Sequence, residues 1–374
     1  MTRRINRITA EQPKTLLIAV YSPYNPSRDI RGYFDEFIHL VASNDISVDS
    51  VQEVRLRAVD PANFFTKGKL EELTSFASQG GFDRIIISEP LTVQQERNIR
   101  SFFRCPVIDR TRLILEIFEK RATSAEGKLQ VKLALLQHEK SRLAGRGLYM
   151  SQQAGRIGTR GPGETQKEKD LQHIEHLMQT IRRDLKRLER IRNTQRKQRL
   201  QREMPLVCLV GYTNAGKSSL LNALTKSTVP AENQLFSTLD TTTRELYIKG
   251  TKIGLISDTV GFIQQLPHNL IEAFKSTLDE LSYAHLIIHV VDISNPNWKS
   301  QIHVVNDIMQ ELGVDKPMVY VLNKSDLVSE AERGTIVSEL SSGTYPIILT
   351  STVAEHGLQE LTEFLQQWHR ERAA

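Results

Sequence analysis

The stretch Gly211-Tyr-Thr-Asn-Ala-Gly-Lys-Ser218 decides the fold of the C-terminal half of this chain. It has the spacing of a P-loop, in which two glycines let the backbone curl around a phosphate, a lysine reaches the terminal phosphates and a hydroxyl binds Mg²⁺. The apolar run 206–210 precedes it as a predicted strand, and residues 218–224 follow as a predicted helix. This is the context that the motif requires, so we expect the chain to bind a nucleoside triphosphate here.

The rest of the C-terminal half alternates between short apolar runs and amphipathic segments. Strands are predicted near residues 206–210, 244–249, 253–257, 286–291, 317–322 and 346–350. Helices are predicted near residues 216–225, 268–283, 297–312, 329–340 and 357–369. Such alternation indicates the α/β class, with a mostly parallel sheet and helices on both faces.

A second motif, Asn323-Lys-Ser-Asp326, selects the base. It follows an apolar strand, and Asp326 there can accept the N1 and N2 protons of guanine, a pattern that adenine lacks. Asn323 can bind the N7 side of the purine or brace the P-loop, and the stem of Lys324 can cover the ring. Backbone amides of Ser351-Thr-Val353, after the last predicted strand, would close over the base. The expected ligand is therefore GTP or GDP.

Asp258-Thr-Val-Gly261 follows the strand at 252–257 and has the pattern of a γ-phosphate sensor. Its aspartate would hold Mg²⁺ through a water, and the Gly261 amide would contact the γ-phosphate. The next residue is Phe262, where Ras-like GTPases place a glutamine that orients water. We therefore expect slow hydrolysis without an activator, with Gln264, Gln265 or a partner supplying the missing group.

The first switch is expected within Phe236-Ser-Thr-Leu-Asp-Thr-Thr-Thr-Arg244. One threonine must reach Mg²⁺ when GTP is bound, and the residues alone leave Thr238, Thr242 and Thr243 as candidates. Asn214 in the P-loop is either a ligand for a monovalent cation such as K⁺ or a brace of the loop.

Three domains are expected: an N-terminal α/β domain at 1–124, a basic helical hairpin with a Gly-rich tip loop at 125–203, and the GTPase domain at 204–374. In the first, strands are predicted at 15–20 and 83–88 and helices at 31–40 and 69–76, which suggests a parallel sheet. The stretch Thr66-Lys-Gly-Lys69 either binds an anion at a helix N-terminus or is an ordinary turn.

The middle segment is predicted to form two antiparallel helices. The first covers 127–143, and a Gly-rich stretch follows at 144–163. The second carries a heptad seam of apolar residues with alternating spacings of three and four. Its members are Leu171, Ile174, Met178, Ile181, Leu185 and Leu188. Residues 195–202 are interpreted as a charged linker.

Charge is concentrated in this segment. Residues 125–203 contain 19 Lys and Arg against 9 Asp and Glu, a net charge of +10, whereas the whole chain carries +5, so the remainder carries −5. A basic middle between acidic flanks indicates a polyanionic partner. The two cysteines, Cys105 and Cys208, are expected to be buried thiols in a reducing cytoplasm. No apolar run is long enough for a membrane span.

Five stretches together resemble the HflX-type GTPases of the Obg–HflX group: 107–115, 126–134, 157–165, 211–220 and 258–263. The resemblance implies an N-terminal α/β domain, a helical hairpin and a GTPase domain that uses Mg²⁺. It implies binding to the large ribosomal subunit and its rRNA, and splitting of stalled or idle ribosomes. It also gives Thr238 the Mg²⁺-binding role. We expect a cytoplasmic monomer.

The expected sites are as follows. Hydrolysis is assigned to Lys217, Thr238 and Gly261, and Mg²⁺ binding to Ser218, Thr238 and Asp258. Nucleotide contacts are assigned to Gly211, Tyr212, Thr213, Asn214, Ala215, Gly216, Lys217, Ser218, Ser219, Phe236, Ser237, Thr238, Leu239, Asp240, Asp258, Thr259, Val260, Gly261, Asn323, Lys324, Ser325, Asp326, Ser351, Thr352 and Val353. Contacts with rRNA are assigned to Arg156, Arg160, Arg182, Arg183, Lys186 and Arg187. The alternative is a regulatory GTPase switch that acts on a protein partner through the coiled-coil hairpin.

Overall fold

The computed structural model describes residues 13–25, 27, 29–145, 162–201, 204–225, 235–236, 242–267, 270, 278, 280–341 and 343–373. The chain divides into two compact units, one centred on residues 33–116 and the other on residues 160–374. Each has its own sheet and its own apolar core. In the described part of the chain, no helix is long and apolar enough to cross a membrane.

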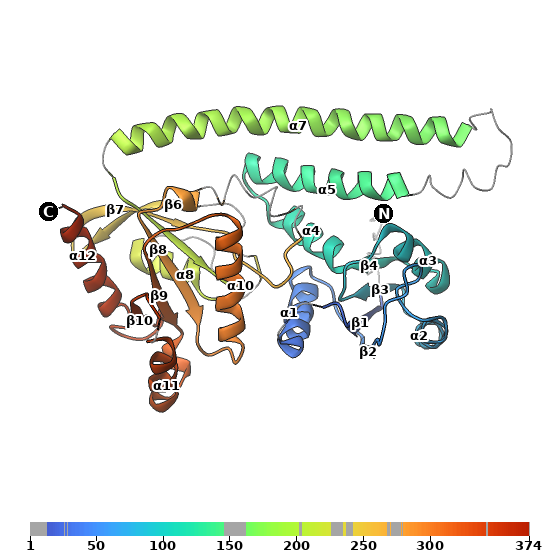
Figure 1. Ribbon diagram of the computed structural model, residues 1–374, viewed down its shortest axis with the longest axis horizontal. Coiled ribbons are helices and arrows are strands. Elements are labelled where there is room, and N and C mark those ends of the chain that lie inside the picture. Colours follow the sequence, from blue (N-terminus) through green and yellow to red (C-terminus); the bar gives the residue numbers. More distant parts are fainter. Residues whose placement is uncertain are drawn as a thin grey trace, which may run out of the picture. The chain divides into compact units, whose positions relative to one another are not determined.

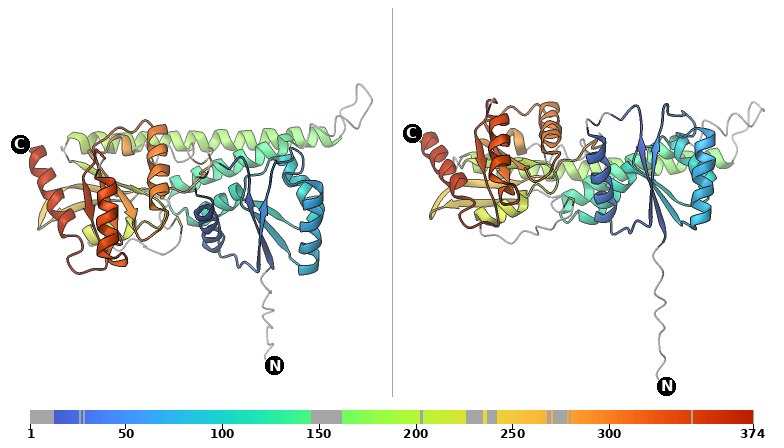
Figure 2. Two further views of the ribbon diagram at one scale, coloured as in Figure 1. Left: turned by 60° about the horizontal axis from the view of Figure 1, so that its bottom comes forward. Right: turned by 90° about the horizontal axis from the view of Figure 1, so that it is seen from below.

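The first unit is built on a parallel sheet with the strand order β2-β1-β3-β4, drawn in blue to teal in Figure 2. Its strands are β1 (Thr15–Tyr21), β2 (Ser50–Arg55), β3 (Arg84–Ile87) and β4 (Val107–Asp109). Its helices include α1 (Ile30–Ser43), α2 (Lys67–Gly80) and α3 (Val93–Phe103).

The sequence predicted β1, β3, α1 and α2 in this unit and missed the others. The edge strand β2 is mostly polar and only Val54 on it is buried, so it lacks the apolar run of a central strand. Strand β4 has three residues, too few to show a period.

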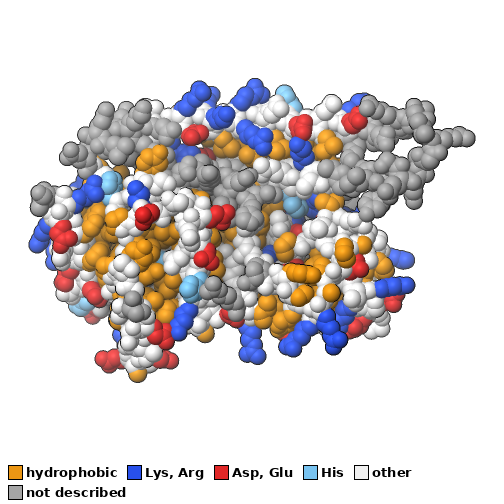
Figure 3. Space-filling model, viewed as in Figure 1, with side chains coloured by type: hydrophobic (Ala, Val, Ile, Leu, Met, Phe, Trp, Pro, Cys, Tyr) orange, Lys and Arg blue, Asp and Glu red, His pale blue; other side chains and the backbone are white. Residues whose placement is uncertain are grey.

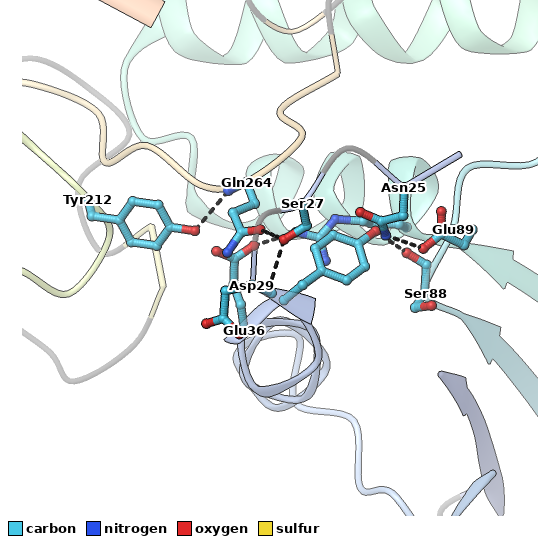
Figure 4. Close-up of polar contacts among 10 residues, drawn as sticks. Asn25, Ser27, Asp29, Glu36, Ser88, Glu89, Tyr212 and Gln264 are labelled. Atoms are coloured by element: carbon cyan, nitrogen blue, oxygen red, sulfur yellow. Dashed lines mark hydrogen bonds and ion pairs between the residues drawn. The ribbon is translucent and has the colours of Figure 1, made fainter. Parts of the chain in front are cut away.

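A buried ionic network lies where these strands end. Arg110, at the start of α4 (Arg110–Arg121), is 1% exposed and forms an ion pair with Glu36 of α1. Its guanidinium lies 4.4 Å from the centre of the Tyr33 ring. The Asn25 amide donates a hydrogen bond of 2.7 Å to the carboxylate of Glu89, as Figure 4 shows. Burial raises the pKa of Glu89, whereas the Asn25 bond and the charge of Arg110 lower it.

The second unit contains a six-stranded sheet in the order β10-β9-β8-β5-β7-β6 (Figure 1). Its strands are β5 (Leu206–Gly211), β6 (Thr242–Ile248), β7 (Thr251–Asp258), β8 (Leu286–Asp292), β9 (Met318–Asn323) and β10 (Ile347–Leu349). Strand β6 runs antiparallel to β7, and the other paired strands are parallel. All six strands correspond to predicted ones.

Helices cover both faces of this sheet, as predicted. They include α8 (Lys217–Thr225), α10 (Trp298–Glu311), α11 (Glu330–Leu340) and α12 (Gln359–Ala373). Alternate residues of β5 and β8 pack with α8 and α12 in one core cluster. Helix α10 contacts the same two strands, and its buried residues lie outside that cluster. The helix predicted at 268–283 lies mostly outside the described residues.

The predicted hairpin is formed by α5 (Ala125–Gly145) and α7 (Pro162–Gln201), which lie side by side in Figures 1 and 2. Ion pairs from Lys140 to Glu175 and from Arg192 to Glu126 show that they run antiparallel. The buried part of the α7 seam consists of Ile174, Met178 and Ile181. The tip-loop arginines Arg156 and Arg160 lie outside the described residues.

Two expectations are wrong in detail. Residues 195–201 are not a linker, because α7 continues as a helix through Gln201. The stretch contains Gln, Arg, Lys and Leu, which are good helix formers, and no helix breaker comes before Pro205. Of the two cysteines, Cys208 is buried but Cys105 is only partly buried, and both are free thiols.

The buried network predicts a large effect of Arg110→Ala, which leaves two buried carboxylates without their cation. We expect the first unit to lose about 3–5 kcal/mol of stability, measured as urea-dependent hydrogen exchange of the β1 and β3 amides. The loss should shrink as pH falls. Without Arg110, the buried carboxyls of the folded unit bind protons more tightly than those of the unfolded chain, so protonation favours the folded form. Arg112→Ala is the matched control. Its ion pair with Glu116 is partly exposed, so the control should lose at most about 1 kcal/mol.

Candidate nucleotide site

The phosphate loop joins β5 to α8, and close backbone contacts fix its two glycines. A Cβ on Gly211 would lie 2.3 Å from the carbonyl oxygen of Val290 on the neighbouring strand β8. Gly216 has a φ of +94°, and a Cβ there would lie 2.2 Å from the side-chain nitrogen of Asn323. Asn214 adopts a φ of +62°, which asparagine tolerates better than most residues. Few other residues are therefore tolerated at these three positions of the loop.

The loop lysine is buried against the loop itself. Lys217 is 6% exposed, and its Nζ donates hydrogen bonds to the carbonyl oxygens of Gly211 (3.1 Å) and Tyr212 (2.8 Å). Burial lowers its pKa to about 8, although the charge of Asp258 raises it. Buried His289 has a pKa lowered to about 3 by burial and by the charge of Lys217, so its ring stays neutral. Negative phosphate charge beside Lys217 would relieve the cost of holding this buried ammonium.

Two buried oxygen ligands meet next to the loop. The Ser218 hydroxyl donates a 2.7 Å hydrogen bond to Oδ2 of Asp258, which is fully buried at the end of β7. The Thr259 hydroxyl donates to the carbonyl of Leu209 (2.7 Å) and ties this segment to β5. Hydroxyl and carboxylate oxygens are the ligands that Mg²⁺ prefers, so the pair fits that ion.

The first-switch residues are only partly placed. Thr243 lies on β6 with its Oγ1 3.2 Å from the Ser257 hydroxyl, and Thr242 pairs with Asp258 at the start of that strand. Phe236 is described and has a φ of +59°. The remaining expected contacts of this switch lie outside the described residues: Ser237, Thr238, Leu239 and Asp240.

The motif Asn323-Lys-Ser-Asp326 lies where β9 ends. The Asn323 amide donates a 2.9 Å hydrogen bond to the carbonyl of Ala215, which is the P-loop brace expected from the sequence as one of its two roles. Lys324 has a φ of +59°, and its Nζ donates to Oδ2 of Asp292 (2.7 Å). Asp326 is exposed within a single 3₁₀ turn, Ser325–Leu327.

The segment after β10 is attached to this motif. The Ser325 amide donates to the carbonyl of Thr350 (3.1 Å). The Ser351 hydroxyl accepts hydrogen bonds from the amides of Val353 (3.3 Å) and Ala354 (3.0 Å). The Val353 side chain is 82% exposed. The loop therefore holds its shape through its own polar groups and leaves its outer surface open.

Parallel pairing explains why these distant motifs meet. Strands β5, β7, β8, β9 and β10 all run in the same direction, so their carboxyl ends share one edge of the sheet. That edge is where open α/β sheets bind ligands. The basic residues Arg182, Arg183, Lys186 and Arg187 are elsewhere, exposed on α7.

Two features of this edge were missed from the sequence. Asp292, which binds Lys324, follows the apolar run 286–291, and this strand-end position could have marked it. The hydroxyl of Tyr212 accepts a 2.9 Å hydrogen bond from the backbone amide of Gln264, as Figure 4 shows. No local pattern marks that contact, because the two residues are 52 positions apart.

Three family models match consecutive parts of the chain. Residues 31–119 match a model described as "GTP-binding GTPase N-terminal", and residues 121–199 match "GTP-binding GTPase Middle Region". Residues 206–324 match "50S ribosome-binding GTPase". A crystal structure of SsGBP in complex with GDP has the same fold, with a TM-score of 0.50, 23% identity and coverage of 96% of this chain and 100% of that one.

Curated relatives match most of the chain. The GTPase HflX of Lacrimispora saccharolytica is 41% identical over 95% of this chain and 82% of its own. That of Caldanaerobacter subterraneus is 40% identical over 88% and 76%, and that of Escherichia coli is 38% identical over 85% and 74%. With these relatives and the three models in agreement, the chain belongs to the HflX family of GTPases and binds and hydrolyses GTP.

Proposed function

We propose that this GTPase acts on the large ribosomal subunit, with its nucleotide state setting its affinity for rRNA. The observation that carries the proposal is the row of exposed basic residues on α7, away from the buried seam of the hairpin. Its members are Arg182, Arg183, Lys186 and Arg187. Figure 3 shows Lys and Arg side chains gathered along the α7 edge of the molecule. Such a row matches the phosphate backbone of folded RNA, which is recognised by shape and charge.

The GTPase domain supports the ribosomal partner through the description of its matched model, a 50S ribosome-binding GTPase. We extend this to the splitting of stalled or idle ribosomes in the cytoplasm by a monomer. In this scheme, GTP orders the switch segments that contain Thr238 and Asp258. The hairpin then docks near the subunit interface and displaces the small subunit, and hydrolysis releases the protein.

We assign the nucleotide chemistry to the residues at the carboxyl edge of the sheet. Lys217 binds the β- and γ-phosphates, and Ser218, Thr238 and Asp258 hold Mg²⁺, Asp258 through a water. Mg²⁺ held by these residues would neutralise charge on the phosphates during transfer of the terminal phosphoryl group to water. The Gly261 amide contacts the γ-phosphate. Gln264 or Gln265, or a ribosomal group, orients the attacking water, and Asn214 is a candidate ligand for K⁺.

The ribosomal assignment predicts the effect of reversing charge on α7. We expect the fourfold change of Arg182, Arg183, Lys186 and Arg187 to Glu to abolish co-sedimentation with the large subunit in sucrose gradients with a non-hydrolysable GTP analogue. Single changes should make the plot of log affinity against log salt shallower by roughly one unit each. GDP affinity should be unchanged.

The matched control reverses four exposed charges on elements other than the two hairpin helices. These are Lys249, Lys299, Arg370 and Arg372. If this control loses ribosome binding as completely as the α7 variant, general charge rather than α7 determines binding. If the unmodified protein stays at the top of the gradient with both nucleotides, the hairpin serves another partner.

The phosphate assignment predicts that Lys217→Ala weakens GDP binding on the order of a hundredfold, because bonds between an ammonium and the phosphates are lost. Titration with a fluorescent GDP measures this. Lys249→Ala, in the exposed turn after β6, should bind like the unmodified protein. A Lys217→Ala protein with unchanged GDP affinity would contradict the role of this lysine.

The base assignment predicts a change of specificity in Asp326→Asn. An amide accepts one hydrogen bond and donates another, which suits the N1–H and O2 of xanthine instead of the N1–H and N2–H of guanine. We expect GDP affinity to fall on the order of a hundredfold and xanthosine diphosphate to bind in its place. Competition between the two nucleotides tests this, and equal loss of both would show that Asp326 does not read position 2 of the base.

A further inference from the structure

The segment after Asp258 is paired with the phosphate loop as an extension of the sheet. In the pairing of β5 with β7, the residue numbers of the two partners differ by 49, as for Leu206 and Leu255. Pairing resumes between Tyr212 and Phe262, where the difference is 50. The chain that continues from β7 therefore contains one extra residue between the two paired stretches. After Gly261 it pairs with the phosphate loop.

Two backbone hydrogen bonds hold this second pairing. The Thr213 amide donates to the carbonyl of Phe262 (2.8 Å), and the Phe262 amide donates to the carbonyl of Gly211 (3.2 Å). A third bond comes from a side chain, since the Tyr212 hydroxyl accepts from the Gln264 amide at 2.9 Å (Figure 4). The segment 262–264 is thus attached to the first three residues of the loop.

This attachment holds Gly261 close to the phosphate loop and to the loop lysine. A Cβ on Gly261 would lie 2.9 Å from the Thr213 Cα and 3.0 Å from Lys217 Nζ. The lysine meanwhile donates to two loop carbonyls. The inference rests on the proposed function, in which a γ-phosphate lies beside this lysine and contacts the Gly261 amide; we expect its arrival to displace the attached segment.

We propose that Tyr212 is a positioning residue whose hydroxyl holds the segment 262–264 on the phosphate loop and so favours GDP over GTP. The backbone bonds of Thr213 and Phe262 are available whatever the side chains are. The hydroxyl adds a side-chain contribution between loop and segment. The Tyr212 hydroxyl stabilises only the form in which the segment is attached, because detachment of the segment moves the Gln264 amide away from the Tyr212 ring. The balance between the two forms depends on such differential contacts.

Tyr212→Phe tests this with little disturbance, because it keeps the ring and removes only the hydroxyl. We expect the affinity ratio of a non-hydrolysable GTP analogue to GDP to rise roughly threefold to tenfold, the worth of one ordinary hydrogen bond. Both affinities are measured by titration of the full chain with fluorescent nucleotides. Tyr247→Phe is the matched control, because its exposed hydroxyl donates to Glu245 on β6.

Hydrogen exchange gives a second readout that does not depend on affinity. In the GDP-bound protein, exchange at the Gln264 amide should be slow, and Tyr212→Phe should accelerate it while leaving the β8 amides unchanged. An unchanged ratio of affinities, including an equal loss for both nucleotides, or an unchanged exchange rate at Gln264 would overturn the proposal. Equal loss would show that the hydroxyl only maintains the shape of the loop.

Discussion

The close approach of the phosphate loop to strand β8 is the constraint on which the nucleotide site depends. At Gly211 the backbone of the loop comes so near the Val290 carbonyl that no side chain fits between them. The loop can therefore curl directly at the end of the central strand β5, and α8 begins within the turn. A helix that begins there presents its N-terminal amides to an anion. A larger residue at this point would push the loop away from the sheet edge that carries the other motifs.

The same edge explains how phosphate, metal and base recognition are connected. Asn323 bonds the P-loop at Ala215, and Ser325 bonds the segment after β10, so the base motif is fixed to both of its neighbours. On the other side, Thr259 ties the Asp258 segment to β5. Each connection spans adjacent or nearly adjacent parallel strands of one sheet. The segment after Asp258 is thus tied to the strand that carries the phosphate loop, and the base motif is braced on both sides.

The parts outside the GTPase domain are stabilised differently from one another. The first unit encloses Arg110 with two buried carboxylates, an arrangement that costs stability unless every charge is matched. The hairpin instead buries a narrow apolar seam, and the basic side chains of Arg182, Arg183, Lys186 and Arg187 on α7 are exposed. Because exposed charges contribute little to folding, the basic residues of α7 are available for a partner.

The sequence alone determined the fold class of both α/β parts, the hairpin and the nucleotide motifs. Apolar runs and seams depend on local periodicity, and the P-loop and Asn323–Asp326 are contiguous. It did not reveal the polar strand β2, the short strand β4 or the helical continuation of α7 to Gln201, where local signals are weak or ambiguous. Only the tertiary structure decided which groups meet: Asp292 with Lys324, Arg110 with Glu36, and Tyr212 with Gln264. Those contacts join residues far apart in the chain, and they exist because sheet pairing brings separate strand ends together, which no local pattern records.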